Sequence, residues 1–194
     1  MIENIWCYSS FMKEDQGLSD LCSVEITTTR LKLVPISMQY TMDCFHEFTP
    51  EITTYMFPAP SKEPSDTEKF ICESLEGLKK GTDLQLVILK KDTKEFLGCA
   101  GLHKTNTKHP ELGVWVKKSA HGQGYGRETM TAIKEWADTH IEYEYIVYPV
   151  DRDNIPSRKI PESLGGNVCK HYDKTSVSGN ILHIVEYHIY PPQH

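Results

Sequence analysis

The chain has 194 residues, enough for one α/β domain with a complete hydrophobic core. Hydrophobic residues make up 39% and charged residues 25%, as in ordinary globular proteins, and no apolar run has the roughly 20 residues of a membrane-spanning helix. The net charge of -6 disfavours nucleic acid as a partner, because nucleic-acid binding leaves a basic footprint. The N-terminus lacks the features of a secretory signal, so we expect a cytoplasmic protein with no membrane partner.

The cysteines are scattered along the chain with no Cys-x-x-Cys spacing (Cys7, Cys22, Cys44, Cys72, Cys99, Cys169). This distribution argues against a zinc ribbon or a redox pair. We expect reduced thiols that fill apolar sites, and no bound metal.

The polarity pattern predicts one mixed α/β domain over residues 24–194, after an N-terminal extension of mixed, aperiodic sequence at 1–23. Ser65 and Glu68 have the spacing of a capping box, and Gly113 marks a candidate bulge. The predicted elements, in chain order, are strand 24–33, helices 38–48 and 65–80, strands 83–90, 95–103 and 111–117, a helix ending near 140, strand 143–150, helix 154–164, and strands 168–172 and 181–190.

Glycines occupy every second position in the loop between the strand at 111–117 and the following amphipathic helix, in the run His121-Gly122-Gln123-Gly124-Tyr125-Gly126. Glycine lets the backbone approach a bound group closely, and the start of a helix adds a positive partial charge. Successive N–H groups can then converge on an anion, and a pyrophosphate is a natural ligand for such a loop.

Two familiar phosphate-binding motifs do not match this loop. A P-loop needs a Lys followed by Ser or Thr at its end, and neither pair ends this one. A dinucleotide-binding loop needs a third glycine where Arg127 stands, and it normally follows the first strand of its fold. A tight turn without a ligand remains as an alternative for the loop taken alone.

The loop, its flanks and the order of elements resemble the GNAT superfamily of N-acetyltransferases, and more closely its branch that acetylates ribosomal-protein N-termini. The family loop reads Q/R-x-x-G-x-G/A, and His121 replaces the usual Gln or Arg. The resemblance spans about residues 24–190 and includes a T-x-R-L-x-L opening at 28–33, the segment 50–56, an x-I-G-x-x-G-L hairpin strand at 96–102 with Leu97 in place of Ile, and an N-x-x-S-R/K segment at 154–158. It implies a single mixed, mostly antiparallel sheet that is flanked by helices and has splayed central strands.

The resemblance also implies acetyl-CoA as co-substrate and an amine as acceptor. In the family, the loop and the splayed strand before it bind the cofactor mostly through backbone groups. We expect the side chain of Trp115 to be core, Asn154 to cap its helix as well as to face pantetheine, and Arg158 to lie either near a CoA phosphate or in solvent. The implied cofactor-binding residues are Val114, Trp115, Val116, His121, Gly122, Gln123, Gly124, Tyr125, Gly126, Asn154, Ser157 and Arg158.

Acetyl transfer needs a neutral amine, a hydrogen-bond donor for the oxyanion and a proton for the departing thiolate. Glu111 is the candidate base, because the branch often carries an acidic residue at the start of this strand; a solvated strand-end carboxylate and a competing role for His103 are the alternatives. Pro161 stands where many GNAT enzymes place a Tyr acid, so Ser157 is the candidate acid. Pro161 should also kink its helix.

The acceptor pocket is expected under the first two helices and the terminal hairpin, with Tyr55, Met56, Phe57 and His103 as substrate-binding residues. An aromatic-rich turn is equally typical of a core. The acceptor is either a protein N-terminus or a small amine, and the protein is expected to be a monomer or a homodimer. The competing hypothesis is a module that binds CoA without turnover, motivated by Pro161 and His121.

Overall fold

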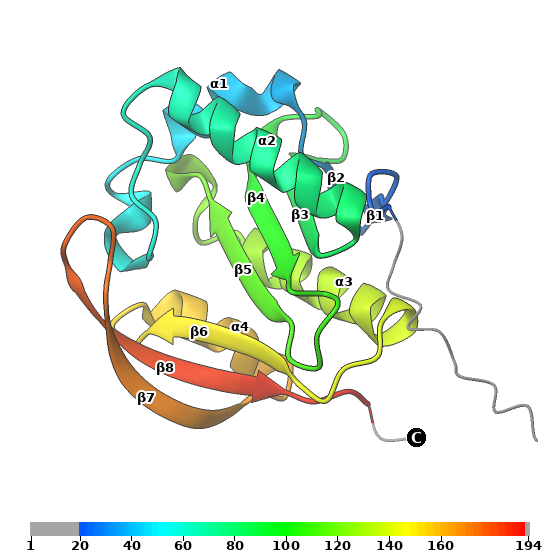
Figure 1. The fold of residues 1–194 in the computed structure, drawn as a ribbon, viewed down its shortest axis with the longest axis vertical. Helices are drawn as coiled ribbons and strands as arrows, with labels where there is room; N and C mark the ends of the chain where they lie inside the picture. The colour runs from blue at the N-terminus through cyan, green and yellow to red at the C-terminus, as the bar shows by residue number, and fades with distance from the viewer. Residues whose placement is uncertain (1–19, 193–194) are drawn as a thin grey trace, which may run out of the picture.

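The computed structural model describes residues 20–192, which form one open sheet of eight strands in the order β1-β2-β3-β4-β5-β6-β8-β7 (Figure 1). Most of the predicted extension, with Cys7, lies outside these residues. Only β5 and β6 are parallel; all other neighbouring strands are antiparallel. The strands are β1 Ile26–Thr27, β2 Leu31–Pro35, β3 Asp83–Lys90, β4 Phe96–His103, β5 Glu111–Val116, β6 Ile146–Asp151, β7 Asn167–Thr175 and β8 Ile181–Ile189.

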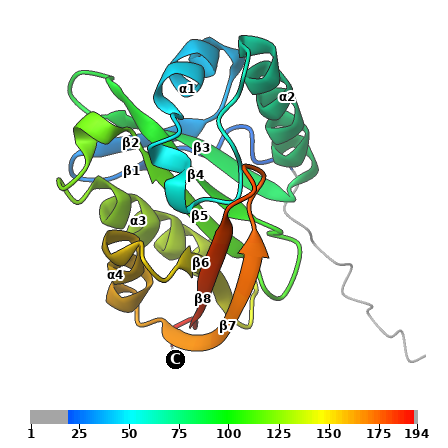
Figure 2. The same ribbon diagram turned by 90° about the vertical axis from the view of Figure 1, so that its left-hand side faces the viewer.

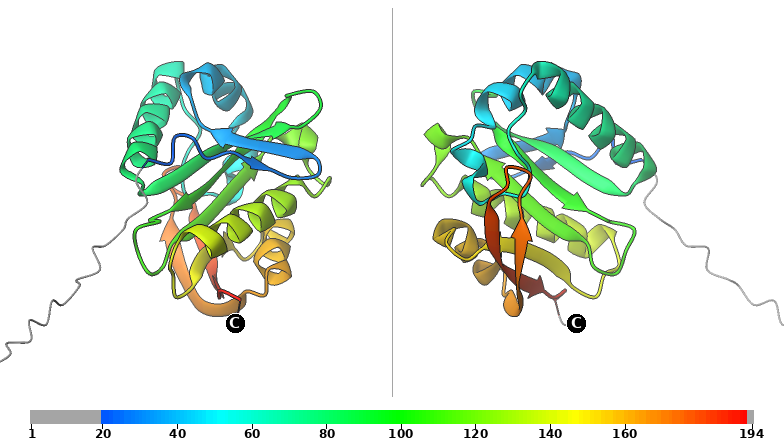
Figure 3. Two further views of the ribbon diagram at one scale, coloured as in Figure 1. Left: turned by 90° about the vertical axis from the view of Figure 1, so that its right-hand side faces the viewer. Right: turned by 60° about the vertical axis from the view of Figure 1, so that its left-hand side comes forward.

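Helices cover both faces of the sheet, α1 and α2 on one face and α3 and α4 on the other (Figures 2 and 3). The central strands β3 and β4 are therefore buried along nearly their whole length, which explains their continuous apolar sequences. The helices are α1 Thr41–Glu47, α2 Pro64–Lys80, α3 Tyr125–His140 and α4 Ile155–Ser163, with 3₁₀ turns η1 Met38–Tyr40, η2 Ile52–Tyr55 and η3 Lys118–Ala120. The mixed, mostly antiparallel α/β class is confirmed.

The predicted first strand is in fact two short strands, β1 and β2, joined by a tight turn. The turn closes through a hydrogen bond of 3.0 Å from Thr28 N–H to the Leu31 carbonyl and one of 2.9 Å from Leu31 N–H to the Thr28 hydroxyl. The alternating, β-branched sequence continues through the turn, so the sequence pattern gave no sign of the turn. Packed structure also begins ahead of residue 24, because Leu21 is buried and its N–H donates to the Leu78 carbonyl.

The start of α2 differs from the prediction as well. The capping box is formed by Glu63 and Asp66, not by Ser65 and Glu68. Pro64 occupies the first helical position, where a missing N–H costs nothing, and this places the cap at Glu63, two residues before Ser65.

Two further predictions concerned the backbone, namely a bulge at Gly113 and a kink at Pro161. Gly113 pairs in regular register with Gly101, so the predicted bulge there is wrong; the irregularities lie at Ile88/Leu89 and in β7. Pro161 lies inside α4, which ends two residues later at Ser163, and the predicted kink stays a prediction.

The centre of the sheet is splayed between β5 and β6. These two strands share a single register pair, Glu111 with Val147, and the Val147 N–H donates to the Pro110 carbonyl at 2.8 Å. In contrast, β5 pairs with β4 over six residue pairs. Beyond Glu111 the strands therefore diverge, which leaves backbone groups on the open side of β5 without a strand partner.

We predict that Gly98→Ala strongly destabilises the fold. Gly98 has φ +152°, and a Cβ there would lie 2.1 Å from the Trp115 carbonyl oxygen, so strands β4 and β5 would have to separate. The free energy of unfolding should fall by about 2–3 kcal/mol in urea denaturation. Gly179→Ala is the control, since Gly179 has φ +87° but no neighbour within 4 Å, and it should cost only about 1 kcal/mol. Equal losses for the two variants would contradict the steric argument.

Candidate functional site

The open side of β5 presents the backbone of alternate residues to the gap. Lys117 N–H donates to the Leu97 carbonyl at 2.7 Å, so the odd-numbered residues of β5 face β4 and the even-numbered ones face the gap. The carbonyl of Val116 is already taken, because a ring nitrogen of His121 lies 2.7 Å from it. Val114 is thus the residue whose N–H and C=O both point freely into the gap, and the backbone of Trp115 faces β4.

The side chain of Trp115 packs as core, as expected. Its ring lies against Phe48 and Phe96, with ring centroids 5.0 and 5.8 Å apart. These contacts fix the outer part of β5 and the direction of its free backbone groups.

The glycine loop has the geometry of an anion-binding turn. Gly122 and Gly124 have φ values of +74° and +79°, which a side chain would strain, and Gly124 caps α3. Within residues 20–192, the N–H groups of Gln123 and Gly124 have no hydrogen-bond acceptor. The first turn of α3 adds its own free N–H groups. The loop therefore fits a phosphate group.

Tyr125 and Gly126, the last two residues of the loop, contribute mainly to packing. The Tyr125 ring is buried beneath the Arg30 guanidinium, 4.6 Å from its centroid, so Tyr125 offers only its backbone to a ligand. Gly126 lies where a Cβ would be 3.5 Å from Ile160, at the contact between α3 and α4. The close approach of these helices brings α4 to the end of the gap.

A cleft of about 870 Å³ opens at the gap and contains most of the predicted residues outside the loop. Val116, Arg158 and the loop residues 121–126 are not among its walls. The sequence-predicted residues that line it are Tyr55, Met56, Phe57, His103, Glu111, Val114, Trp115, Asn154 and Ser157.

The tip of the β7–β8 hairpin lies beside the segment after η2 (Figure 1), and both contribute residues to the cleft wall. Val177 N–H donates to the Phe57 carbonyl at 2.9 Å, and the Lys174 ammonium lies 3.8 Å from the centroid of the Phe57 ring. Tyr55 and Phe57 are 42% and 44% exposed, so they form the open wall of the cleft and not core.

His103 and Glu111 pair across β4 and β5 on the cleft wall. The Nδ1 atom of His103 lies 3.1 Å from the Asp83 carboxylate, which lowers the pKa of Asp83, and Nε2 would be 2.7 Å from a Cβ at Gly101. The imidazole therefore lies over the glycine and presents Nε2 to the cleft. Glu111, by contrast, is bound to the Lys104 ammonium at 2.9 Å.

Ser157 at the start of α4 has a partner that the sequence did not reveal. Asn154 caps the helix through a 3.3 Å bond from Ser157 N–H, which confirms the capping role. The Ser157 hydroxyl lies 3.1 Å from the hydroxyl of Tyr148, which is 3% exposed. Burial raises the pKa of Tyr148 to about 12, so its phenol keeps its proton. In sequence, Tyr148 reads as one more apolar residue of a buried strand.

Arg158 is directed to β8. Its Nε donates to the Tyr187 hydroxyl at 3.1 Å and its Nη1 to the Arg152 carbonyl at 3.2 Å. The guanidinium thus ties α4 to the sheet through these two nitrogens, and a place near a CoA phosphate stays a prediction.

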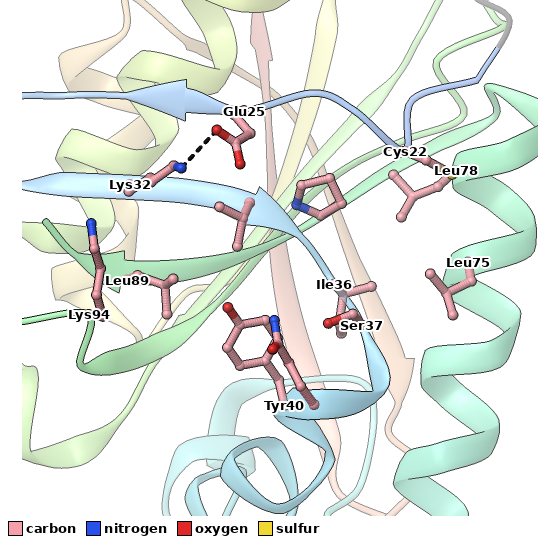
Figure 4. Close-up of a pocket in the computed structure, with 13 residues that line it drawn as sticks. Cys22, Glu25, Lys32, Ile36, Ser37, Tyr40, Leu75, Leu78, Leu89 and Lys94 are labelled. Carbon is pink, nitrogen blue, oxygen red and sulfur yellow. Dashed lines mark ion pairs between the residues drawn. The ribbon is translucent and has the colours of Figure 1, made fainter.

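A second hollow, of about 550 Å³, lies between the first strands and α2 and contains none of the predicted residues (Figure 4). An ion pair of 2.8 Å between Glu25 and Lys32 lies beside it. Across the described part of the chain, no cluster of His, Cys, Asp or Glu is placed to hold a metal ion. None of the helices within residues 20–192 has the length and apolar character needed to span a bilayer.

Comparisons with known proteins agree with this architecture. A curated relative, the uncharacterized N-acetyltransferase p20 of Bacillus licheniformis, is 24% identical over 123 residues, which cover 62% of this chain and 69% of the relative. The ribosomal L7/L12 alpha-N-protein acetyltransferase RimL, in complex with coenzyme A, superposes with a TM-score of 0.78 at 14% identity, covering 87% of this chain and 98% of that one.

A spermidine N-acetyltransferase from Vibrio cholerae, in complex with CoA and spermine, gives a TM-score of 0.72 at 14% identity over 84% of this chain and 96% of that one. At these identities the structures support the fold alone. The model of the acetyltransferase (GNAT) domain family matches residues 30–167. The chain therefore belongs to the GNAT family of acetyltransferases.

Proposed function

We propose that this protein is an acetyl-CoA-dependent N-acetyltransferase that acts on a primary amine. The observation that carries the proposal is the position of the free Val114 backbone between a phosphate-fitting glycine loop and a large open cleft. A donor held along β5 would present its reactive end to the cleft, where an amine can enter.

The glycine loop and the splayed strand are the proposed cofactor site. Acetyl-CoA supplies the activated acetyl group. The N–H groups of Gln123 and Gly124 and the first turn of α3 bind the pyrophosphate, and the Val114 backbone pairs with the pantetheine arm. Asn154 and Ser157 face that arm from α4. The remaining residues of this site shape or brace it: Trp115, Val116, His121, Gly122, Tyr125 and Gly126.

We assign the general base to His103 in place of Glu111. An attacking alkyl amine must first lose a proton, since its ammonium form has a pKa of about 10. Asp83 fixes the orientation of the imidazole through its contact with Nδ1, and Nε2 faces the cleft. The Glu111 carboxylate is paired with the Lys104 ammonium, which makes it a poorer acceptor for the proton of the amine. We assign it to orienting the acceptor.

We assign the proton for the departing thiolate to the Ser157 hydroxyl, with Tyr148 behind it. Tyr148 is held in its protonated form by burial and bonds to Ser157 from the side away from solvent. This pair takes the place of the Tyr that Pro161 removes from α4. When the C–S bond breaks, the Ser157 hydroxyl donates to sulfur and takes back, through water, the proton that the reacting nitrogen releases, so the products are an acetamide and the free thiol of CoA.

The acceptor is either a protein N-terminus or a small amine. RimL and the spermidine acetyltransferase are similar in fold to this chain, and their names cover both classes. Tyr55, Met56 and Phe57 form the proposed acceptor wall. We place the reaction in the cytoplasm, in a monomer or a homodimer. A CoA-binding module without turnover is the second candidate, favoured by His121 and Pro161.

We predict acceptor-dependent release of the CoA thiol when the protein is incubated with acetyl-CoA and a panel of polyamines and peptides with free N-termini. The acceptor should gain one acetyl group by mass spectrometry. Gly124→Val is the control, because a side chain at φ +79° blocks close approach to the loop. CoA binding without release on any acceptor would favour the module, and no CoA binding at all would refute both.

We predict that His103→Gln lowers kcat/KM by about 100-fold and removes the acid limb of the pH–rate profile, because the basic group is gone. Asp83→Asn should retain the limb and lower kcat/KM less than His103→Gln does, since the imidazole loses only the carboxylate that orients it. Glu111→Gln serves as the comparison and should leave the limb in place. A limb that survives His103→Gln and disappears in Glu111→Gln would return the base to Glu111.

We predict that Ser157→Ala lowers kcat by about 100-fold and Tyr148→Phe by about tenfold, with a smaller effect on the KM for acetyl-CoA. The double variant should be no slower than Ser157→Ala alone, because the phenol acts through Ser157. Steady-state kinetics measures this directly. Multiplicative losses in the double variant would show that the two hydroxyls act separately.

A further inference from the structure

The turn between β1 and β2 contacts the glycine loop, although the two contacting residues, Arg30 and Gln123, are 93 positions apart in the sequence. This turn belongs to the T-x-R-L-x-L segment, to which the proposed mechanism assigns no role. Arg30 lies at its centre, and its side chain is 45% exposed at the back of the loop.

Glu128, in the first turn of α3, is the point on which these contacts converge. Its carboxylate accepts from the Thr28 hydroxyl at 2.6 Å, from the Arg30 N–H at 3.0 Å and from the Arg30 Nε at 2.6 Å. Arg30 Nη2 also lies 2.6 Å from this carboxylate. Burial opposes ionisation of Glu128, but the bonds from Thr28 and Arg30 outweigh it and lower its pKa.

The remaining guanidinium nitrogen, Nη1, donates to the Gln123 carbonyl at 2.9 Å. A trans peptide is planar, with its C=O and the following N–H in opposite directions. Holding the Gln123 carbonyl toward Arg30 therefore turns the Gly124 N–H to the outer side of the loop, where a phosphate would lie. Glycine at 124 has no side chain to resist rotation of this peptide, so an outside contact must fix it.

The turn itself is anchored on its other side. Lys91 N–H donates to the Arg30 carbonyl at 2.8 Å, and the Lys91 ammonium donates to the Thr28 carbonyl at 3.1 Å. The β3–β4 hairpin, the β1–β2 turn and the start of α3 thus form one braced unit behind the loop.

We propose that Arg30 and Glu128 are positioning residues for the phosphate-binding loop: together they orient the peptide between Gln123 and Gly124 so that its N–H faces the pyrophosphate. This inference rests on the proposed cofactor role of the loop. Its action is geometric, since the charge of Arg30 is paired with that of Glu128.

The substitution Glu128→Gln separates this account from simple charge attraction. Removing a carboxylate beside an anion site should tighten CoA binding if charge alone mattered. In the positioning account binding weakens, because Arg30 loses its anionic partner and with it its fixed orientation. Arg30→Lys keeps the charge, but an ammonium cannot bond to Glu128 and Gln123 in the planar fork of a guanidinium.

We expect both single variants to raise the Kd for CoA by about five- to tenfold in calorimetric titration, as for the loss of a pre-organised site. In turnover, the KM for acetyl-CoA should rise while kcat at saturating donor stays near that of the wild type. The double variant should be no weaker than either single one. An unchanged Kd in Arg30→Lys, or tighter binding in Glu128→Gln, would overturn the proposal.

Lys134→Met is the matched control. Lys134 and Asp138 form an ion pair of 2.6 Å on the same helix, with side chains 12% and 16% exposed, and neither contacts the loop. This variant should leave the Kd for CoA unchanged even if it lowers the melting temperature. A similar rise in Kd would show that any weakening of α3 is sufficient and would refute a specific role for Arg30.

A separate measurement keeps the proposal testable if the wild-type protein binds no CoA, a result that would refute the proposed function itself. Backbone ¹⁵N relaxation of the unliganded protein reports the order of the Gln123 and Gly124 amides. Their order parameters should fall in Arg30→Lys and stay unchanged in Lys134→Met. Unchanged values in Arg30→Lys would overturn the positioning role independently of any ligand.

Discussion

The divergence of β5 from β6 is the constraint on which the rest of the site depends. Each strand is well paired on its other side, β5 with β4 and β6 with β8, over six residue pairs each. The two halves of the sheet share a single register pair, Glu111 with Val147. Backbone groups beyond that point need a partner from outside the sheet, either water or a ligand. The cleft, its aromatic wall and the start of α4 are all arranged around this opening.

Side chains in this site serve mainly to hold backbone in place. Trp115 packs between aromatic rings behind β5, His121 occupies the carbonyl of Val116, and Asn154 caps α4. The groups offered to a ligand are then N–H and C=O groups whose directions are fixed. This explains how His121 can stand where the family uses Gln or Arg: its ring bonds to the chain itself. A backbone site of this kind tolerates variation in side chains while its geometry is kept.

The sequence predicted those features that depend on local spacing. Alternate glycines before an amphipathic helix indicated the anion loop, and the order of periodic segments indicated the mixed sheet. It could not reveal pairs that form across the fold: the phenol of Tyr148 meets Ser157 only when α4 packs on β6, and Asp83 meets His103 only across the β3–β4 pair. The bond of Arg158 was hidden for the same reason, because its partner Tyr187 comes from the last strand.

The central claim, that free backbone at the splayed strand and the glycine loop binds CoA, is tested most directly by following backbone amide resonances during a titration with CoA. The account predicts that the largest shifts occur at Val114 and from Gln123 to Gly126, the amides that face the gap and the loop. Shifts confined to other surfaces, for example the hollow beside Glu25 and Lys32, or no shifts at saturating CoA, would contradict it.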